Sequence, residues 1–236
     1  MFTRSTLEAE YRAQSEAFAH SRAFLSLEEG RASRQDYDSF IAGVCRTHLK
    51  SPQILAFLYS VAPPAVADLL RHNMLEELGL DEAGVSHPAL LLQLAEQAGF
   101  SLKAQRALEA EAQGSLRRMC TDPILYGTFK EVGLGVLLEV TCFEWMLSKL
   151  ASRIARFLCL HRQLSEASLQ WFSHHSEVDL RHAEEGLDAV IEYLTYYEFD
   201  AFAATSILEI TFRENPFLKR YFGESLLLET TALAVA

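Results

Sequence analysis

Three side chains of metal-binding types follow one another at helical spacing: His175, Asp179 and His182. At about 100° per residue, an α-helix places all three within roughly 60° of one another around its axis. Imidazole nitrogens and a carboxylate that face the interior of a helical bundle suit iron or manganese and commonly build dinuclear sites. The spacing predicts part of such a site, with a solvated polar helix face as the alternative. His174 lies about 100° from this stripe, so we interpret it as a neighbour or a surface residue.

Glu144 is a further candidate because apolar residues surround it in the segment 140–147. We expect its carboxylate to be buried, which is costly unless the group is paired, protonated or bound to a metal. Metal binding is one interpretation, and a salt bridge to an arginine is the other.

Glu77 and His87 form a weaker pair of candidates. Glu77 lies near the end of an expected helix and His87 comes just before Pro88, and the loop between them can bring the two together. Glu76 stays open as the ligand in place of Glu77. A surface ion pair between His72 and Glu76, four residues apart on one helix, is the competing interpretation.

Helices must position these side chains, because nearly every segment has apolar residues at i, i+3 and i+4. No alternating run is long enough for a sheet, so the predicted fold class is all-α. With 236 residues, half of them hydrophobic, the chain can bury a sizeable core in one domain. We therefore expect a single helical domain over residues 1–236.

Capping residues, proline and glycine predict where several helices begin and end. Ser33 and Asp36 resemble a capping box, and the helix that they open ends before Ser51–Pro52. Pro63–Pro64 begins another helix, which should stop at Gly79 because glycine accepts the left-handed conformation. A further helix is expected over about 88–98, and Gly99 and Ser101 separate it from another that ends near Cys120. Three more are expected over about 124–161, over 165–198 in one or two pieces, and over 200–213 as the last.

The longest expected helix follows Asp122–Pro123 and spans about 124–161. It contains Gly127, Gly133 and Gly135, each of which weakens a helix by roughly 1 kcal/mol relative to alanine. These glycines mark a candidate kink.

The charge of the chain excludes one class of partner. The 21 Lys and Arg residues against 32 Asp and Glu residues give a net charge of −11, without a cluster of basic residues. A phosphate backbone would be repelled, so we expect no nucleic-acid partner.

Cysteine usage and hydropathy indicate the compartment. The four cysteines are scattered without a Cys-x-x-Cys pair, which suits a reducing compartment and argues against a thiolate zinc site or a disulfide framework. The N-terminus has no apolar signal core, and Glu139 and Glu144 interrupt the most apolar stretch, 132–147. We expect a cytoplasmic protein that does not span a membrane.

The order Glu77…His87, Glu144 and His175-x-x-x-Asp179-x-x-His182 resembles the haem-oxygenase-like di-iron oxidases and oxygenases, relatives of the thiaminase II and pyrroloquinoline-quinone-synthesis folds. The resemblance covers about residues 35–212 and keeps the order and spacing of the motifs. It implies a bundle of about seven to nine helices. It also implies that two iron ions, one carboxylate bridging them, are held by Glu77, His87, Glu144, His175, Asp179 and His182.

This resemblance further implies a non-haem di-iron enzyme that activates dioxygen as its co-substrate, with manganese or another divalent metal as an alternative to iron. The candidate catalytic carboxylates are then Glu77, Glu144 and Asp179. The implied partners are a small, partly apolar substrate and an electron donor, and a homodimer stays open. The N-oxygenating relatives use an additional carboxylate before the first ligand, but this chain has no Asp or Glu between Asp38 and Asp68. Whether a side chain of the protein itself is consumed also stays open.

The apolar residues of the expected interior would suit a small or chain-like substrate, although such residues more often form core: Phe129, Leu137, Phe143 and Trp145.

Two functions of other classes remain as alternatives. One is a thiaminase-II-like hydrolase of pyrimidine compounds in which a cysteine attacks the substrate, because Cys142 near Trp145 is similar to a region of that subfamily. The other is a non-catalytic helical interaction protein. Six ligand-type residues argue against the second, since a binding scaffold has no need to bury so many polar groups.

Overall fold

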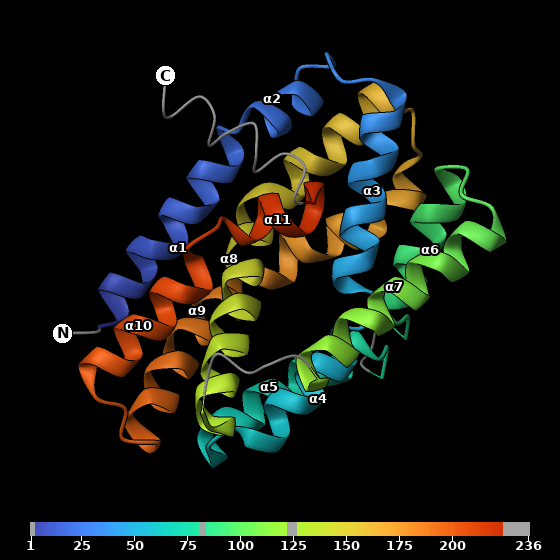
Figure 1. The fold of residues 1–236 in the computed structure, drawn as a ribbon. Helices are drawn as coiled ribbons and strands as arrows, with labels where there is room; N and C mark the ends of the chain where they lie inside the picture. Colours follow the sequence, from blue (N-terminus) through green and yellow to red (C-terminus); the bar gives the residue numbers. More distant parts are fainter. Residues whose placement is uncertain (1–2, 81–83, 122–126, 224–236) are drawn as a thin grey trace.

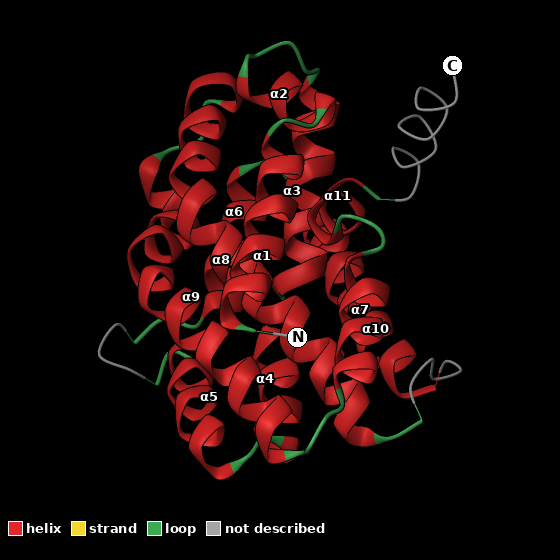
Figure 2. Cartoon of the chain, turned by 90° about the vertical axis from the view of Figure 1, so that its left-hand side faces the viewer, coloured by secondary structure: helices red, strands yellow, loops and turns green. Residues whose placement is uncertain are grey.

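The structure is a computed structural model that describes residues 3–80, 84–121 and 127–223; the side chains of residues 118–121 and 177–180 lie outside this description. Within these ranges all the regular secondary structure is helical (Figures 1 and 2), so the predicted all-α class is confirmed. The helices are α1 (Arg4–Ala19), α2 (Arg22–Glu28), α3 (Arg34–His48), α4 (Ser51–Val61), α5 (Pro64–Glu77), α6 (His87–Gln97), α7 (Leu102–Thr121), α8 (Phe129–Arg162), α9 (Gln170–Tyr196), α10 (Ala201–Phe212) and α11 (Pro216–Phe222), with a 3-10 turn at Glu166–Leu169.

Helices α8 and α9 form the most extensive helix–helix contact and run through the middle of the bundle (Figure 1). They approach closely at two glycines. A Cβ atom on Gly133 would lie 2.2 Å from the hydroxyl oxygen of Tyr193, and one on Gly186 would lie 2.9 Å from the Thr141 side chain. Although glycine is a poor helix former, Gly133 therefore allows α8 to pack closely against α9, and α8 continues through it without a break.

Most of the predicted helix ends are confirmed. The Ser33 amide donates to the Asp36 carboxylate at 2.8 Å, and the backbone amide of Asp36 donates to the Ser33 hydroxyl oxygen at 3.3 Å. Gly79 has a φ of +68°, as the stop of α5 requires. Asp122 and Pro123 lie outside the described residues, and α8 begins at Phe129.

The prediction that residues 200–213 form the last helix was wrong, because α11 follows. Pro216 occupies the first turn of α11, and the Asn215 side chain caps it by accepting the Leu218 amide at 3.0 Å. With the short helices α2 and α11 included, the described residues form more helices than the seven to nine that the resemblance implies.

Helix α11 packs closely against α3. A Cβ atom on Gly43 of α3 would lie 2.1 Å from the Tyr221 carbonyl oxygen, so only glycine lets α11 pack this closely.

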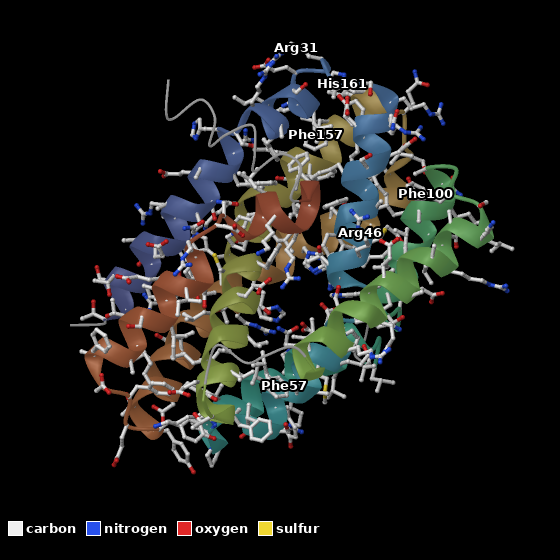
Figure 3. The ribbon with its side chains drawn as sticks, viewed as in Figure 1. Arg31, Arg46, Phe57, Phe100, Phe157 and His161 are labelled. Atoms are coloured by element: carbon white, nitrogen blue, oxygen red, sulfur yellow. The ribbon has the colours of Figure 1, made fainter. Side chains whose placement is uncertain are left out.

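Buried apolar side chains from all parts of the bundle form the core. Phe157 of α8 (Figure 3) contacts the rings of Phe24, Tyr37 and Phe40, which joins α8 to α2 and α3. Among the described residues, no helix combines the length and apolarity that a bilayer crossing needs.

Candidate metal centre

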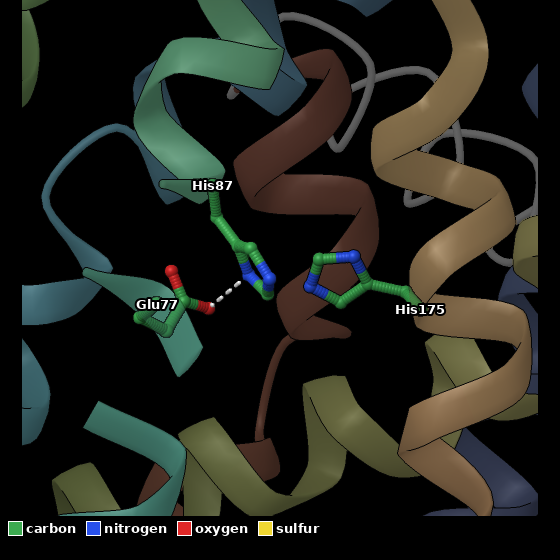
Figure 4. A group of neighbouring side chains, drawn as sticks. All are labelled: Glu77, His87 and His175. Carbon is green, nitrogen blue, oxygen red and sulfur yellow. Dashed lines mark ion pairs between the residues drawn. The ribbon is translucent and has the colours of Figure 1, made fainter. Parts of the chain in front are cut away.

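Three of the candidate ligands meet at the junction of three helices. Glu77 is the last residue of α5, His87 is the first of α6, and His175 lies in α9. A ligand atom from each lies within 4.8 Å of the other two, and all three side chains are buried. Figure 4 shows the two imidazole rings and the carboxylate pointing toward one another. The end of α5 and the start of α6 thus bring Glu77 and His87 together.

The contact between Glu77 and His87 has the spacing of two ligands rather than the geometry of a hydrogen bond. Nδ1 of His87 lies 3.0 Å from Oε1 of Glu77, yet this buried nitrogen makes no hydrogen bond of acceptable direction. Two atoms that bind one ion at 2.0–2.2 Å and at a right angle lie about 3 Å apart. The other carboxylate oxygen, Oε2, accepts a hydrogen bond from the Ser51 hydroxyl at the start of α4. The pair therefore fits a cation.

His175 is held in the form that can bind a metal. Its Nδ1 lies 2.6 Å from the carbonyl oxygen of Trp171, and because a carbonyl only accepts, Nδ1 carries the proton. The lone pair is then on Nε2. Burial, with a contribution from nearby His87, lowers the pKa of His175 well below its usual value, so the ring is neutral at neutral pH. The ring also packs on Trp171, with centroids 4.1 Å apart.

Glu76 and His182 form a second contact. Their Oε2 and Nε2 atoms are 3.0 Å apart, and burial lowers the pKa of His182 to about 4. The ion pair between His72 and Glu76, which the sequence offered as the competing interpretation, is also present, because Nε2 of His72 lies 3.1 Å from Oε1 of Glu76. Arg181 lies 3.5 Å from that same oxygen. Adjacent residues Glu76 and Glu77 thus face different imidazoles, and both are buried.

Glu144 of α8 is paired with an amide rather than with an arginine. Asn73 of α5 donates from Nδ2 to Oε1 of Glu144, and no ion pair of Glu144 occurs among the described residues. Burial, together with the nearby carboxylates Glu77, Glu185 and Glu76, raises the pKa of Glu144 to about 8. At neutral pH and without a cation, this carboxyl group is mostly protonated.

Asp179 and His174 are two further residues of α9 with side chains of metal-binding types. Asp179 belongs to α9, but its side chain lies outside the described residues. His174 is half-buried rather than on the surface, and its ring centroid is 4.9 Å from that of His87. It is therefore a neighbour of the candidate ligands.

The candidate ligands whose side chains are described line one cavity of about 930 Å³, a volume typical of small-molecule sites. Among its lining residues are Glu77, His87, Glu144, His174, His175 and His182. Phe143 also lines this cavity, whereas Phe129 is 75% exposed. Leu137 and Trp145 are buried and do not line it.

Cys142 is poorly suited to nucleophilic attack. Its side chain is 0% exposed and does not line the cavity. Burial, aided by the carboxylates Glu10 and Glu139, raises the pKa of its thiol well above the usual value. A cysteine nucleophile needs an accessible thiolate, and Cys142 provides neither access nor charge.

Sequence reasoning missed three polar residues of the site. Asn73 lies four residues before Glu77 on α5, so helical spacing could have indicated it. Ser51 gives no such signal, because it reaches Glu77 only through the packing of α4 against α5. His48 lines the cavity and lies 2.8 Å from the Tyr221 hydroxyl oxygen, and burial lowers its pKa to about 3.

A comparison with known families finds a match over most of the chain. A family described as "iron-containing redox enzyme" matches residues 39–211, which is well over half of the chain and includes all six candidate ligands. No curated protein sequence matches significantly.

Proposed function

The chain belongs to the family of iron-containing redox enzymes, and on this basis we propose that it is a non-haem di-iron oxidase or oxygenase that activates dioxygen. The observation that carries the proposal is the convergence of Glu77, His87 and His175. Their ligand atoms lie within 4.8 Å of one another, and the His87–Glu77 contact has the spacing of two ligands of one ion. Two imidazoles and a carboxylate are the donor set of many non-haem iron sites.

Both ions have candidate ligands in this proposal. Glu77, His87 and His175 would hold the first ion, and Glu144, Asp179 and His182 would hold the second. Glu76 would compete with Glu77 as a ligand, because its Oε2 atom lies 3.0 Å from Nε2 of His182. Bound iron supplies the reversible redox chemistry that reduction of dioxygen requires, and manganese is the alternative metal.

The residues around the ligands have positioning roles. The Trp171 carbonyl orients His175, the Ser51 hydroxyl holds one oxygen of Glu77, and Asn73 holds Glu144. Because its pKa is about 8, Glu144 must release a proton to bind a cation at neutral pH. The cavity of about 930 Å³ can take a small substrate, and an external electron donor completes the proposed partners.

The proposal is tested by loading the metal-free protein anaerobically with ferrous iron and mixing it with oxygenated buffer. We expect up to two irons per chain, oxygen consumption and a visible absorption that depends on oxygen. Glu144→Ala removes a ligand and should abolish oxygen consumption. Cys142→Ser is the control, and it should leave oxygen consumption nearly intact.

Three outcomes would contradict the proposal. Protein that binds no iron and consumes no oxygen would favour a non-catalytic interaction protein. Metal-free protein that hydrolyses a pyrimidine compound, and loses this activity in Cys142→Ser, would favour the hydrolase. Equal oxygen consumption by Glu144→Ala and the parent would remove Glu144 from the ligand set.

A further inference from the structure

A second, much smaller cavity reaches the candidate metal centre from another side, and we call it the small cavity. It has a volume of about 20 Å³ and lies between α5, α8 and α9. Four residues line both the small cavity and the large one: Asn73, Val140, Glu144 and His182. Glu144 and His182 are candidate ligands, so the two cavities meet at the candidate centre.

The volume of the small cavity limits the size of its occupant. One water molecule needs about 10–15 Å³ of such space. The small cavity, with about 20 Å³, therefore has room for one molecule of the size of water or dioxygen. An organic molecule has room only in the cavity of about 930 Å³ on the other side of Glu144. The two cavities thus separate ligands by size.

Most of the wall of the small cavity is hydrocarbon. Its larger apolar side chains and one alanine come from all three helices: Leu69, Leu70, Leu137, Val140 and Ala189. Leu70, Leu137 and Ala189 are buried, whereas Leu69 and Glu185 are half-buried. The outer end of the small cavity therefore lies beside Leu69 and Glu185, and its inner end lies at Glu144.

Gly186 of α9 keeps the space next to Glu144 open. A Cβ atom at this position would lie 3.6 Å from Oε2 of Glu144 and 2.9 Å from the Thr141 side chain. Any side chain in place of Gly186 would therefore fill the passage in front of this carboxyl group.

The polar side chains around the small cavity already have partners within the protein. Asn73 donates to Oε1 of Glu144, and the Thr141 hydroxyl donates to the Leu137 carbonyl oxygen at 2.8 Å. The other two polar side chains also contact protein groups: His182 contacts Glu76 at 3.0 Å, and Glu185 contacts Arg181 at 3.6 Å. Because two to four polar groups usually hold a buried water, this cavity favours an apolar occupant.

From this arrangement we infer that the small cavity is a binding site for a small apolar gas, through which dioxygen reaches the candidate metal centre. The large cavity then stays available to an organic substrate. As a statement about dioxygen, the inference rests on the proposed function. As a statement about gas binding, it concerns the metal-free protein alone.

Xenon tests the site, because it is a chemically inert, apolar atom that binds in apolar cavities. The full-length, metal-free protein is placed under xenon pressure, and its methyl signals are followed by NMR. We expect the signals of Leu70, Leu137 and Ala189 to shift as xenon binds. Ala189→Val adds two methyl carbons to the wall and should weaken xenon binding at this place about fivefold.

The matched control is Ala204→Val, which makes the same change at a buried position of α10 that lines neither cavity. It should bind xenon like the parent. Leu69→Ala is a second variant that the fold should tolerate, since Leu69 is half-buried, and it widens the outer end. We expect it to bind xenon about twofold more tightly than the parent.

The site is overturned if the signals of Leu70 and Leu137 do not shift under xenon. It is also overturned if Ala189→Val and Ala204→Val bind xenon alike, or if Leu69→Ala binds it no more tightly than the parent.

The reaction of the iron-loaded protein with oxygen is the second measurement. Ala189→Val should raise the KM for oxygen about fivefold and leave kcat unchanged, because it narrows the small cavity and keeps every candidate ligand. An unchanged KM would overturn the dioxygen route even where xenon binds. Xenon binding by a protein that does not react with oxygen after iron loading would contradict only the proposed function.

Discussion

The two ring nitrogens of His175 have different roles, because Nδ1 is committed to the Trp171 carbonyl and only Nε2 can bind a cation. The neighbouring ring of His174 lines the same cavity, so position on the helix alone does not separate ligand from neighbour. At the scale of single residues, the direction of one lone pair therefore decides whether a side chain can act as a ligand.

We predict that His175→Gln loses at least tenfold in ferrous iron affinity, since the variant keeps a polar side chain but lacks the imidazole lone pair. Direct titration with ferrous iron under nitrogen measures the change. His20→Gln is the control, because His20 is exposed and its ring lies against the carbonyl oxygen of Glu16, at the end of α1. Equal losses in the two variants would exclude His175 as a ligand.

Glu144 makes the stability of the metal-free protein depend on pH. Its folded pKa of about 8 lies above the ordinary carboxyl value of 4.5, so the folded state binds more protons between these two pH values. The free energy of unfolding therefore falls as pH rises from about 4.5 to 8. We predict that Glu144→Gln removes this loss and is more stable than the parent by about 1–3 kcal/mol at pH 8.

Urea unfolding of metal-free protein at pH 5, 6.5 and 8 measures this difference. The advantage of Glu144→Gln should be small at pH 5 and grow with pH. Glu192→Gln changes an exposed carboxylate of α9 and should show no such trend. A constant difference across the three pH values would mean that Glu144 is already ionised.

At the scale of helices, close approach at glycine decides which elements can meet. Gly43 lets α11 lie against α3, and α11 carries Tyr221, whose hydroxyl lies 2.8 Å from His48 at the cavity wall. Gly133 and Gly186 do the same for α8 and α9, which carry Glu144 and His175.

We predict that Gly43→Ala destabilises the protein by about 1–3 kcal/mol, because the new methyl group would meet backbone atoms that cannot move aside. The melting temperature should fall by several degrees. Gly127→Ala is the matched control, since among the described residues a Cβ atom there meets the flexible Glu131 side chain, at 3.5 Å. Equal melting temperatures for Gly43→Ala and the parent would show that α11 is not packed on α3 in this way.

At the scale of the whole molecule, the candidate centre joins parts of the chain that are far apart in sequence. Its candidate ligands come from the end of α5, the start of α6, the middle of α8 and α9. Each helix brings a carboxyl group or an imidazole to a common cavity, so a bound cation would link four elements.

We therefore predict that ferrous iron slows amide hydrogen exchange at the end of α5, the start of α6 and around His175, and leaves α1 and α2 unchanged. The reason is that a ligand bound only to the folded state raises the free energy of local opening where it binds. Exchange measured by mass spectrometry with and without iron tests this. Uniform protection, or none, would contradict a centre at this place.

The sequence alone determined the features that depend on local geometry. Helical periodicity indicated the all-α class, and proline, glycine and capping residues indicated most helix ends, because each acts within a few residues. The spacing of His175 and His182 likewise placed both on one face of a helix. Tertiary structure decided everything that depends on which helices meet. It turned Glu76 toward His182 and Glu77 toward His87, although the two are neighbours in sequence.

Packing also decided the environment of single groups. Asn73 rather than an arginine reaches Glu144, and Cys142 is sealed away from the cavity. The cavity wall also gathers cations from distant segments, with Arg46 and Lys50 from α3 and the α3–α4 junction and Lys219 and Arg220 from α11. Partners, burial and charge balance arise from contacts between distant segments, and the periodicity of one helix carries no information about the helix that it will face.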